Sequence, residues 1–284
     1  MAIILNGRAA SSAIMEELKA QVRELKEEKI TPTLALLLVG DDRYSSQYVE
    51  MKARRCREAG VEPQVHHLPA ETAQSQILSF IEQLNEDPAI HGIIVQLPLP
   101  KGFDELTVVE AISPSKDVDG LSPMSLGKVL MGGEGFLSAG VEAIMELLQR
   151  HGINPERKHW VIIGLSNIVG KPLAALLTNM DVTFTCCGAD EPDLADSTRR
   201  ADVLVVDIGR KWAVTADMVK KGCVVLDNGN NYESRKVYGD VDFEAVKEKA
   251  SAITPVPGGI GPLLITMLIR NTLKAAARAK ISSA

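Results

Sequence analysis

One stretch of the chain decides its fold class: from His159 to Pro172 the sequence reads HWVIIGLSNIVGKP. An apolar run of strand length ends at Gly164, and a segment with helical character begins directly after the turn. A strand that leads through a turn of small residues into a helix is typical of dinucleotide-binding sites. The reason is that the N–H groups at the start of the helix point at a phosphate.

The turn matches no phosphate or nucleophile motif completely. Ser166 stands where GxGxxG requires its second glycine, and Pro172 stands where the P-loop requires Ser or Thr. Ile168 stands where the nucleophile elbow GxSxG requires glycine. The place of the turn between strand and helix therefore indicates dinucleotide binding, without a complete signature.

Around this turn, strands and helices alternate along the chain, which predicts an α/β fold. We expect strands at 33–39, 64–68, 91–96, 159–164, 182–186, 201–207 and 223–227, and helices at 9–29, 43–59, 73–84, 103–112, 141–150, 169–177 and 261–279. The Gly-rich stretch 132–135 lies near the boundary of two lobes. We predict an N-terminal α/β lobe over 1–137, a Rossmann-like doubly wound lobe over 138–262, and a C-terminal helix within 263–284 that packs back on the first lobe.

Composition and charge argue against several classes of function. Of 284 residues, 45% are hydrophobic and 24% are charged; 31 Lys and Arg stand against 37 Asp and Glu, for a net charge of −6. Proteins that bind nucleic acid or anionic lipid are usually basic. Aromatic residues make up only 4%, too few for base-stacking surfaces. We therefore expect neither a nucleic-acid partner nor a membrane partner.

The cysteines and the N-terminus suggest a cytoplasmic protein. Cys56, Cys186, Cys187 and Cys223 form no CxxC pair and no Cys/His ligand spacing, so neither a disulfide framework nor a metal site is expected. No apolar run reaches the ~20 residues of a membrane span. No basic leader precedes an apolar core at the N-terminus, so no signal peptide is expected.

The helix expected at 43–59 carries the first candidate site. Ser45, Tyr48 and Lys52 share one helical face, where an aromatic ring and a cation could meet a substrate; the alternative is a solvated face. The same helix holds a basic cluster that suggests either an anionic substrate tail or an ordinary charged surface: Arg54, Arg55 and Arg57.

Three loops carry the other candidates. Gln96 follows a buried strand, at the sheet edge where open α/β sheets bind ligands, or it bonds its own loop. Asp117 and Asp119 could bind a metal or the paired N–H donors of a heterocycle, or could form an Asx-type turn. The segment Thr254 to Pro262 holds three prolines and three glycines, and this rigidity favours a backbone clamp on a ligand over an ordinary loop.

These pieces, in this order, resemble the bifunctional methylenetetrahydrofolate dehydrogenase/methenyltetrahydrofolate cyclohydrolase family. Six stretches carry the resemblance: Tyr48 to Lys52 (YVEMK), Gln96 to Pro100 (QLPLP), Lys116 to Gly120 (KDVDG), Ser166 to Pro172 (SNIVGKP), Gly239 to Phe243 (GDVDF) and Thr254 to Pro262 (TPVPGGIGP). The resemblance implies a homodimer of two-lobed chains, a folate cleft between the lobes, tetrahydrofolate derivatives as partners and NAD or NADP as cofactor. A dehydrogenase with one activity and a non-catalytic folate-binding relative stay open as alternatives.

The resemblance also implies roles for individual residues. Lys52 is the central catalytic group, Gln96 holds it, Tyr48 packs on the folate ring system and Asp119 bonds the pterin edge. The remaining substrate contacts are Ser45, Leu97, Pro98, Pro257, Gly258 and Gly259. The cofactor contacts are Gly164, Leu165, Ser166, Asn167, Ile168, Val169, Cys187, Gly188, Asp190, Gly209, Asn230 and Thr254.

The sequence departs from the family mainly on the cofactor side. The family often has Arg at Leu165, Ser at Cys187 and an apolar residue at Asn230; it commonly has Pro-Cys-Thr-Pro within 135–141 and Met-Thr at 263–264. Arg and Ser often surround the 2′-phosphate of NADP in the family. Asp190 follows Gly170 at a spacing suited to the ribose 2′-OH of NAD, or it caps the next helix; Arg199 and Arg200 could restore phosphate binding. The sequence therefore favours NAD, whereas the family more often uses NADP.

Overall fold

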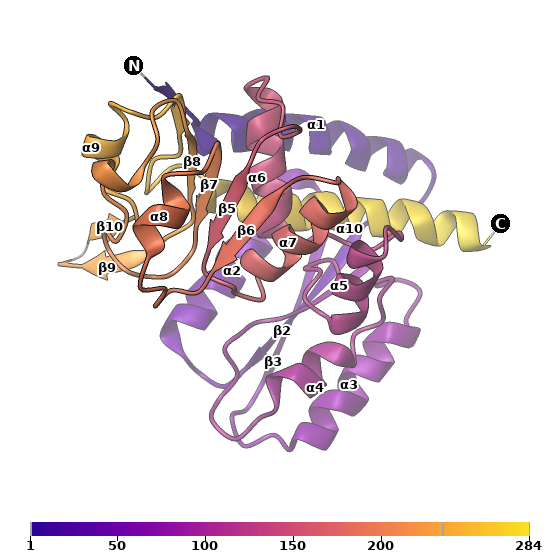
Figure 1. Ribbon diagram of the computed structural model, residues 1–284. Helices are drawn as coiled ribbons and strands as arrows, with labels where there is room; N and C mark the ends of the chain where they lie inside the picture. Colours follow the sequence, from indigo (N-terminus) through magenta and orange to yellow (C-terminus); the bar gives the residue numbers. More distant parts are fainter. Residues whose placement is uncertain (1, 235, 284) are drawn as a thin grey trace. The chain divides into compact units, whose positions relative to one another are not determined.

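The computed structural model describes residues 2–234 and 236–283, and the chain divides into two compact units (Figure 1). Unit 1 comprises the first twelve residues, Val129–Gly132 and Ser138–Leu264. Unit 2 comprises Ala13–Lys128, Gly133–Leu137 and the chain from Ile265 onward. This two-part α/β architecture confirms the predicted fold class. Over the described residues, no helix combines the length and the apolar character needed to cross a membrane.

Unit 1 is built on a parallel sheet of six strands in the order β1-β11-β8-β7-β5-β6 (Figure 1). The strands are β1 (Ile3–Ile4), β5 (Trp160–Ile163), β6 (Phe184–Cys187), β7 (Val203–Val206), β8 (Val224–Asp227) and β11 (Ala252–Ile253). β6 pairs with one side of β5 and β7 with the other. The order therefore reverses at β5, and open α/β sheets bind ligands at the carboxyl ends beside such a switch point.

Short helices and a hairpin complete unit 1. The helices are α6 (Ala139–Arg150), α7 (Gly170–Asn179), α8 (Leu194–Thr198), α9 (Phe243–Val246) and the 3₁₀ turn Ala216–Met218. β9 (Asn231–Glu233) and β10 (Lys236–Tyr238) pair as antiparallel strands. The core includes alternate residues of the central strands, such as Val161, Leu204 and Val225, because alternate side chains of a strand share one face.

Unit 2 holds a smaller parallel sheet in the order β3-β2-β4. β2 (Thr33–Val39) is buried along its whole length between β3 (Glu62–Leu68) and β4 (Gly92–Val95). Its odd-numbered residues, Ala35 to Val39, share a core with α3 (Gln74–Glu86) and α4 (Glu105–Glu110). α2 (Arg43–Ala59) follows β2; Asp42 accepts the N–H of Ser45 at its start, and Gly60 ends it at a φ of 86°.

The remaining helices are α1 (Gly7–Glu27), α5 (Pro123–Leu130) and α10 (Gly261–Ser283). From Ile265 onward α10 belongs to unit 2. The fully buried Asn271 of this helix donates to the backbone carbonyls of Val118, at 2.9 Å, and Leu137, at 3.1 Å. The C-terminal helix thus packs on the first lobe, as predicted.

By its contacts the chain divides differently from the predicted lobe of 1–137 at its start, where residues 2–12 belong to unit 1. They join unit 1 because β1 pairs with β11 and extends the sheet. Val129–Gly132 also joins unit 1, where the side-chain amide of Asn179 donates to the carbonyl of Val129. A strand of two residues is too short to show any alternation, so the sequence pattern missed it.

Candidate active site

A buried lysine and a glutamine meet beside the carboxyl edge of the smaller sheet. Lys52 lies on α2, which follows β2, and Gln96 directly follows β4, the neighbour of β2. The Lys52 ammonium donates to Oε1 of Gln96 at 3.0 Å. The amide nitrogen of Gln96 donates to the carbonyl of Leu97 at 2.6 Å, and this bond orients Oε1 toward the lysine.

Burial lowers the pKa of this lysine. Lys52 is only 8% exposed, and loss of water around the ammonium lowers its pKa. The negative charge of Asp119 acts in the opposite direction. Burial raises the pKa of Asp119, while the positive charge of Lys52 lowers it and the charge of Asp117 raises it. Lys52 and Asp119 therefore act on each other's pKa, each against the effect of burial.

The two carboxyl groups of the 116–120 loop have different roles. Asp117, only 1% exposed, accepts the N–H groups of Gly120, Leu121 and Ser122 at 3.1, 3.3 and 2.9 Å. It therefore forms the Asx-type turn that was the alternative at this position. Asp119 is the carboxyl group left to act on Lys52, and the ligand interpretation can apply only to it.

The other predicted substrate residues of unit 2 lie around this pair. Ser45 is buried at the start of α2, and Tyr48, one turn before Lys52, is 40% exposed. Leu97 is half-buried and packs on the core of the smaller sheet, whereas Pro98 is exposed. Tyr48, the predicted aromatic contact with the substrate, is thus partly open to solvent.

The basic cluster of α2 forms ion pairs along its own helix. Arg54 and Arg55 contact Glu58 at 3.6 and 2.9 Å, and Arg57 contacts Glu50 at 3.5 Å. These pairs favour the charged-surface interpretation over an anionic substrate tail. Cys56 on the same helix is fully buried, and burial raises the pKa of its thiol to about 12.

In unit 1 the turn after β5 is shaped by close backbone contacts. Gly164 has a φ of 93°, and a Cβ there would lie 2.0 Å from the carbonyl oxygen of Asp207. The Ser166 hydroxyl accepts the N–H groups of Val169 and Gly170 at 3.0 and 3.4 Å. It also donates to Asp207 at 2.5 Å. Ser166 therefore caps α7 itself, and those two N–H groups are not open to a phosphate.

The predicted cofactor residues divide by exposure. Seven lie exposed at the carboxyl ends of β5 to β8: Leu165, Asn167, Ile168, Gly188, Asp190, Gly209 and Asn230. Four are buried, namely Gly164, Val169, Cys187 and Thr254, and Ser166 is half-buried. A Cβ at Gly188 or Gly209 would meet no atom within 4 Å, so the backbone there is open. The exposed loops at one edge of the sheet fit the approach of a dinucleotide.

The structure adds one residue that the sequence reasoning missed. Arg210 follows β7, and its guanidinium donates to the carbonyl of Ala189 at 3.0 Å and to the carboxylate of Asp190 at 2.5 Å. Arg199, proposed as a cation for this loop, instead contacts Asp196 and Asp217. The available signal was a Gly-Arg pair directly after a buried strand, at the edge where ligands bind.

The Pro- and Gly-rich segment holds the start of α1. The carbonyl of Gly258 accepts the N–H groups of Gly7 and Arg8 at 2.9 and 3.3 Å. A Cβ at Gly7 would lie 1.7 Å from the carbonyl oxygen of Gly259. Gly258 and Gly259 are buried or nearly so, and Pro257 is part of the same tight segment. Gly258 has a φ of 121°, and a Cβ at Gly259 would lie 2.7 Å from the carbonyl oxygen of Pro255. The backbone thus explains both glycines, and their contact with substrate stays a prediction.

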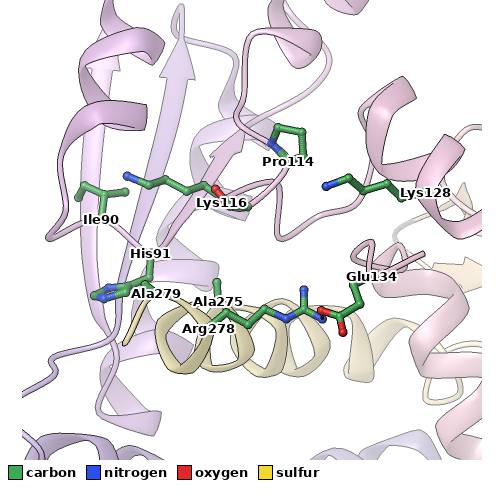
Figure 2. A pocket seen from close by; sticks show the side chains of 10 residues that line it. Ile90, His91, Pro114, Lys116, Lys128, Glu134, Ala275, Arg278 and Ala279 are labelled. Carbon is green, nitrogen blue, oxygen red and sulfur yellow. Dashed lines mark ion pairs between the residues drawn. The ribbon is translucent and has the colours of Figure 1, made fainter. Parts of the chain in front are cut away.

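A separate cavity of about 770 Å³ opens in unit 2, lined by none of the predicted site residues (Figure 2). Two of its cations contact other groups of the protein: the Lys116 ammonium donates to the carbonyls of Leu84 and Asp87, and Arg278 lies 3.8 Å from Glu134. Across the described residues, no group of three or more His, Cys, Asp or Glu side chains could hold a metal ion.

Comparison with known proteins identifies the family. Two family models match the chain. The model described as "Tetrahydrofolate dehydrogenase/cyclohydrolase, catalytic domain" matches residues 5–119, and the one described as "Tetrahydrofolate dehydrogenase/cyclohydrolase, NAD(P)-binding domain" matches residues 138–280. The "Bifunctional protein FolD" of Magnetococcus marinus is 48% identical over 281 residues, 98% of this chain and 99% of that protein.

Solved structures agree with the sequence comparison. The bifunctional FolD methylenetetrahydrofolate dehydrogenase/cyclohydrolase of Campylobacter jejuni superposes with a TM-score of 0.96, at 45% identity, covering 98% of this chain and 99% of that one. The FolD of Trypanosoma brucei, solved with NADP and an inhibitor, superposes with a TM-score of 0.92 at 34% identity, and the match covers 98% of both chains. These matches confirm the resemblance seen in the six sequence stretches: the chain belongs to the tetrahydrofolate dehydrogenase/cyclohydrolase family.

Proposed function

We propose that the chain oxidises 5,10-methylenetetrahydrofolate to 5,10-methenyltetrahydrofolate with NAD(P) and hydrolyses that product to 10-formyltetrahydrofolate. The observation that carries the proposal is the buried Lys52, whose ammonium lies 3.0 Å from Gln96 Oε1 at the sheet edge where ligands bind. Family membership and relatives named as bifunctional support both activities.

The residues of unit 2 fit the chemistry of the second step. The methenyl product is an amidinium cation. Its hydrolysis ends when the bond from the methenyl carbon to N5 breaks and N5 gains a proton; before that, water must add to the same carbon and lose a proton. A buried lysine with a lowered pKa provides a neutral amine that accepts this proton, and Gln96 holds the amine by its side-chain oxygen. Asp119 accepts the N–H donors of the pterin, and Tyr48 packs its exposed ring on the folate.

The residues of unit 1 fit NAD(P). When bound, the cofactor accepts the hydride that leaves the methylene carbon. Open backbone at Gly188 and Gly209 and the exposed Leu165, Asn167 and Ile168 leave room for a dinucleotide at the carboxyl edge of the sheet. Asp207 and the Ser166 hydroxyl fix the turn before α7, so the loop is preorganised.

Within NAD(P), the proposal includes a preference for NAD. Leu165 and Cys187 replace the Arg and Ser with which the family often surrounds the 2′-phosphate, and Cys187 is buried. The exposed Asp190 lies just beyond β6, where a carboxylate can accept the ribose 2′-OH and repel a phosphate.

The proposal also includes a homodimer, which the family resemblance implies. The aromatic residues around the β9–β10 hairpin support it, because Trp212 and Tyr232 are 49% and 71% exposed. Sedimentation equilibrium of the purified chain measures the mass in solution. A monomer at micromolar concentration contradicts this part of the proposal.

A spectrophotometric assay tests the activities. The chain is incubated with 5,10-methylenetetrahydrofolate and either NAD or NADP, and reduced nicotinamide is followed; hydrolysis is followed separately with 5,10-methenyltetrahydrofolate. We expect both reactions. Oxidation without hydrolysis leaves a dehydrogenase with one activity, and the absence of both, with folate still bound, leaves a non-catalytic relative. Either result overturns the bifunctional proposal.

A further inference from the structure

The Arg210–Asp190 pair links two loops at the cofactor edge of unit 1. Asp190 follows β6 and Arg210 follows β7, and both strands flank β5. Neighbouring strands are about 4.8 Å apart, so the two loops begin about 10 Å from each other. The extended arginine side chain spans this gap and reaches both the carboxylate of Asp190 and the carbonyl of Ala189.

Buried carboxylates fix the backbone from which Arg210 extends. Asp240, fully buried, accepts the N–H groups of Ile208, Gly209 and Arg210 at 2.7, 3.0 and 2.8 Å. Asp227 in turn accepts the N–H of Asp240 at 3.1 Å. The GDVDF stretch, which the proposed chemistry does not use, thus holds the Arg210 loop rigid. A rigid base reduces the entropy lost when the guanidinium binds an anion.

The pair is open to exchange. The Arg210 side chain is 51% exposed and that of Asp190 is 84% exposed, so water weakens their attraction. A phosphate dianion offers the guanidinium more charge and the same two-point geometry as a carboxylate. A 2′-phosphate that enters this loop can therefore displace Asp190 from Arg210.

We propose that Arg210 is a cofactor-specificity residue, which receives the 2′-phosphate of NADP in place of the Asp190 carboxylate. The inference rests on the proposed NAD(P) function and deepens it. With NAD, Arg210 stays on Asp190 and holds that carboxylate beside the ribose 2′-OH. With NADP, Arg210 supplies the positive charge that Leu165 and Cys187 lack. The chain thus retains use of NADP while it prefers NAD.

Equilibrium binding of NAD and NADP to the full chain tests the inference. Titrations are measured for the wild type, Arg210→Ala, Asp190→Ser and the double variant. Arg210→Ala should lower the affinity for NADP by about tenfold or more, as expected for the loss of one charge-assisted contact. It should lower the affinity for NAD by about threefold at most. Asp190→Ser should raise the affinity for NADP, and this gain in affinity should vanish in the double variant. Arg157→Ala, at an exposed arginine of the same unit that precedes β5, is the matched control and should change neither affinity.

Each contrary outcome has a distinct meaning. If Arg210→Ala weakens NAD and NADP equally, Arg210 only supports the loop and the inference is wrong. The same conclusion follows if neither affinity changes, or if Arg157→Ala shows the loss instead. If the wild type binds NAD or NADP, the proposed function stands through all of these results. If the wild type binds neither dinucleotide, the proposed oxidation and the inference fall together.

Discussion

The two units build their predicted sites by opposite means. In unit 2 the central groups are buried side chains that contact one another, as the Lys52–Gln96 bond shows. In unit 1 most predicted contacts are exposed loop residues, and the buried carboxylates Asp227 and Asp240 lie beneath them and bond backbone N–H groups. Burial shifts the pKa of a reacting group, whereas residues of an exposed loop on a rigid base can be substituted with little loss of stability.

This contrast explains two of the positions at which the sequence departs from its family. Leu165 and Asn230 are exposed loop residues of unit 1, where substitutions cost little stability. Tyr48, Lys52, Gln96 and Asp119 match the family in unit 2. Substitutions in unit 2 should therefore change the chemistry by large factors, and substitutions in the loops of unit 1 should change only the choice of cofactor.

The largest effect is expected from Lys52→Met, which keeps the buried aliphatic volume and removes the amine. Hydrolysis of 5,10-methenyltetrahydrofolate should fall by about 100-fold or more, because a positioned general base contributes about 10²–10⁴-fold. The rate is measured by the loss of methenyl absorbance, and circular dichroism checks the fold. Lys101→Met, at an exposed lysine shortly after Gln96, is the control and should retain the wild-type rate. A Lys52→Met rate above about a tenth of wild type contradicts the role of Lys52.

The second-largest effect is expected from Asp119→Asn. The pterin should lose a charged acceptor, and folate affinity should fall by about 10- to 100-fold, since charge-assisted hydrogen bonds are worth roughly 1.5–3 kcal/mol. Titration with a non-reacting folate measures the change. Asp41→Asn, at an exposed carboxylate before α2, is the control. An unchanged affinity would place the pterin away from this loop.

A smaller effect, but a more specific one, is expected from Gln96→Glu. Burial lowers the pKa of Lys52, so the active neutral amine accumulates as pH rises through that lowered value. A carboxylate in place of the amide favours the ammonium and raises the pKa of Lys52 again. The limb of the pH–rate profile on which hydrolysis rises with pH should therefore move to higher pH, by about one pH unit or more.

The pH dependence of the loss distinguishes two roles of Gln96. At a pH below the limb, the rate should fall about tenfold for every pH unit by which the limb moves, and it should recover at higher pH. A rate that falls equally at every pH would mean that the glutamate misplaces Lys52 without changing its charge.

Sequence reasoning succeeded where the pattern was long and local. β2 and α2 begin and end at the predicted residues, because a continuous apolar run and a Gly60 stop are strong signals. β1 and β11 were missed because two-residue strands form only through pairing with each other and β8. α5 was missed in a stretch rich in serine and glycine.

The site shows the same limit. Lys52 and Gln96 could be paired only through the family resemblance, because nothing in a spacing of 44 residues indicates contact. Arg210 was missed because its partner depends on strand order, which places the β6 and β7 loops on either side of β5. The sequence predicted that the segment with Gly258 and Gly259 clamps a ligand. It gave no sign that the N-terminus of α1 is the backbone that approaches these two glycines.

The smallest effect is expected from Leu165→Arg, which sharpens the comparison from the side of unit 1. Leu165 is 44% exposed, so the longer side chain fits without loss of packing, and the free energy of unfolding should change by no more than about 0.5 kcal/mol. The added cation lies in the turn after β5, beside the Arg210 and Asp190 loops. It should attract the 2′-phosphate by about 1 kcal/mol, so kcat/KM for NADP relative to NAD should rise about fivefold. Hydrolysis of 5,10-methenyltetrahydrofolate, which needs no dinucleotide, should keep its wild-type rate. If Leu165→Arg lowers hydrolysis as strongly as oxidation, the loops of unit 1 do more than choose the cofactor, and the division of labour between the two units is wrong.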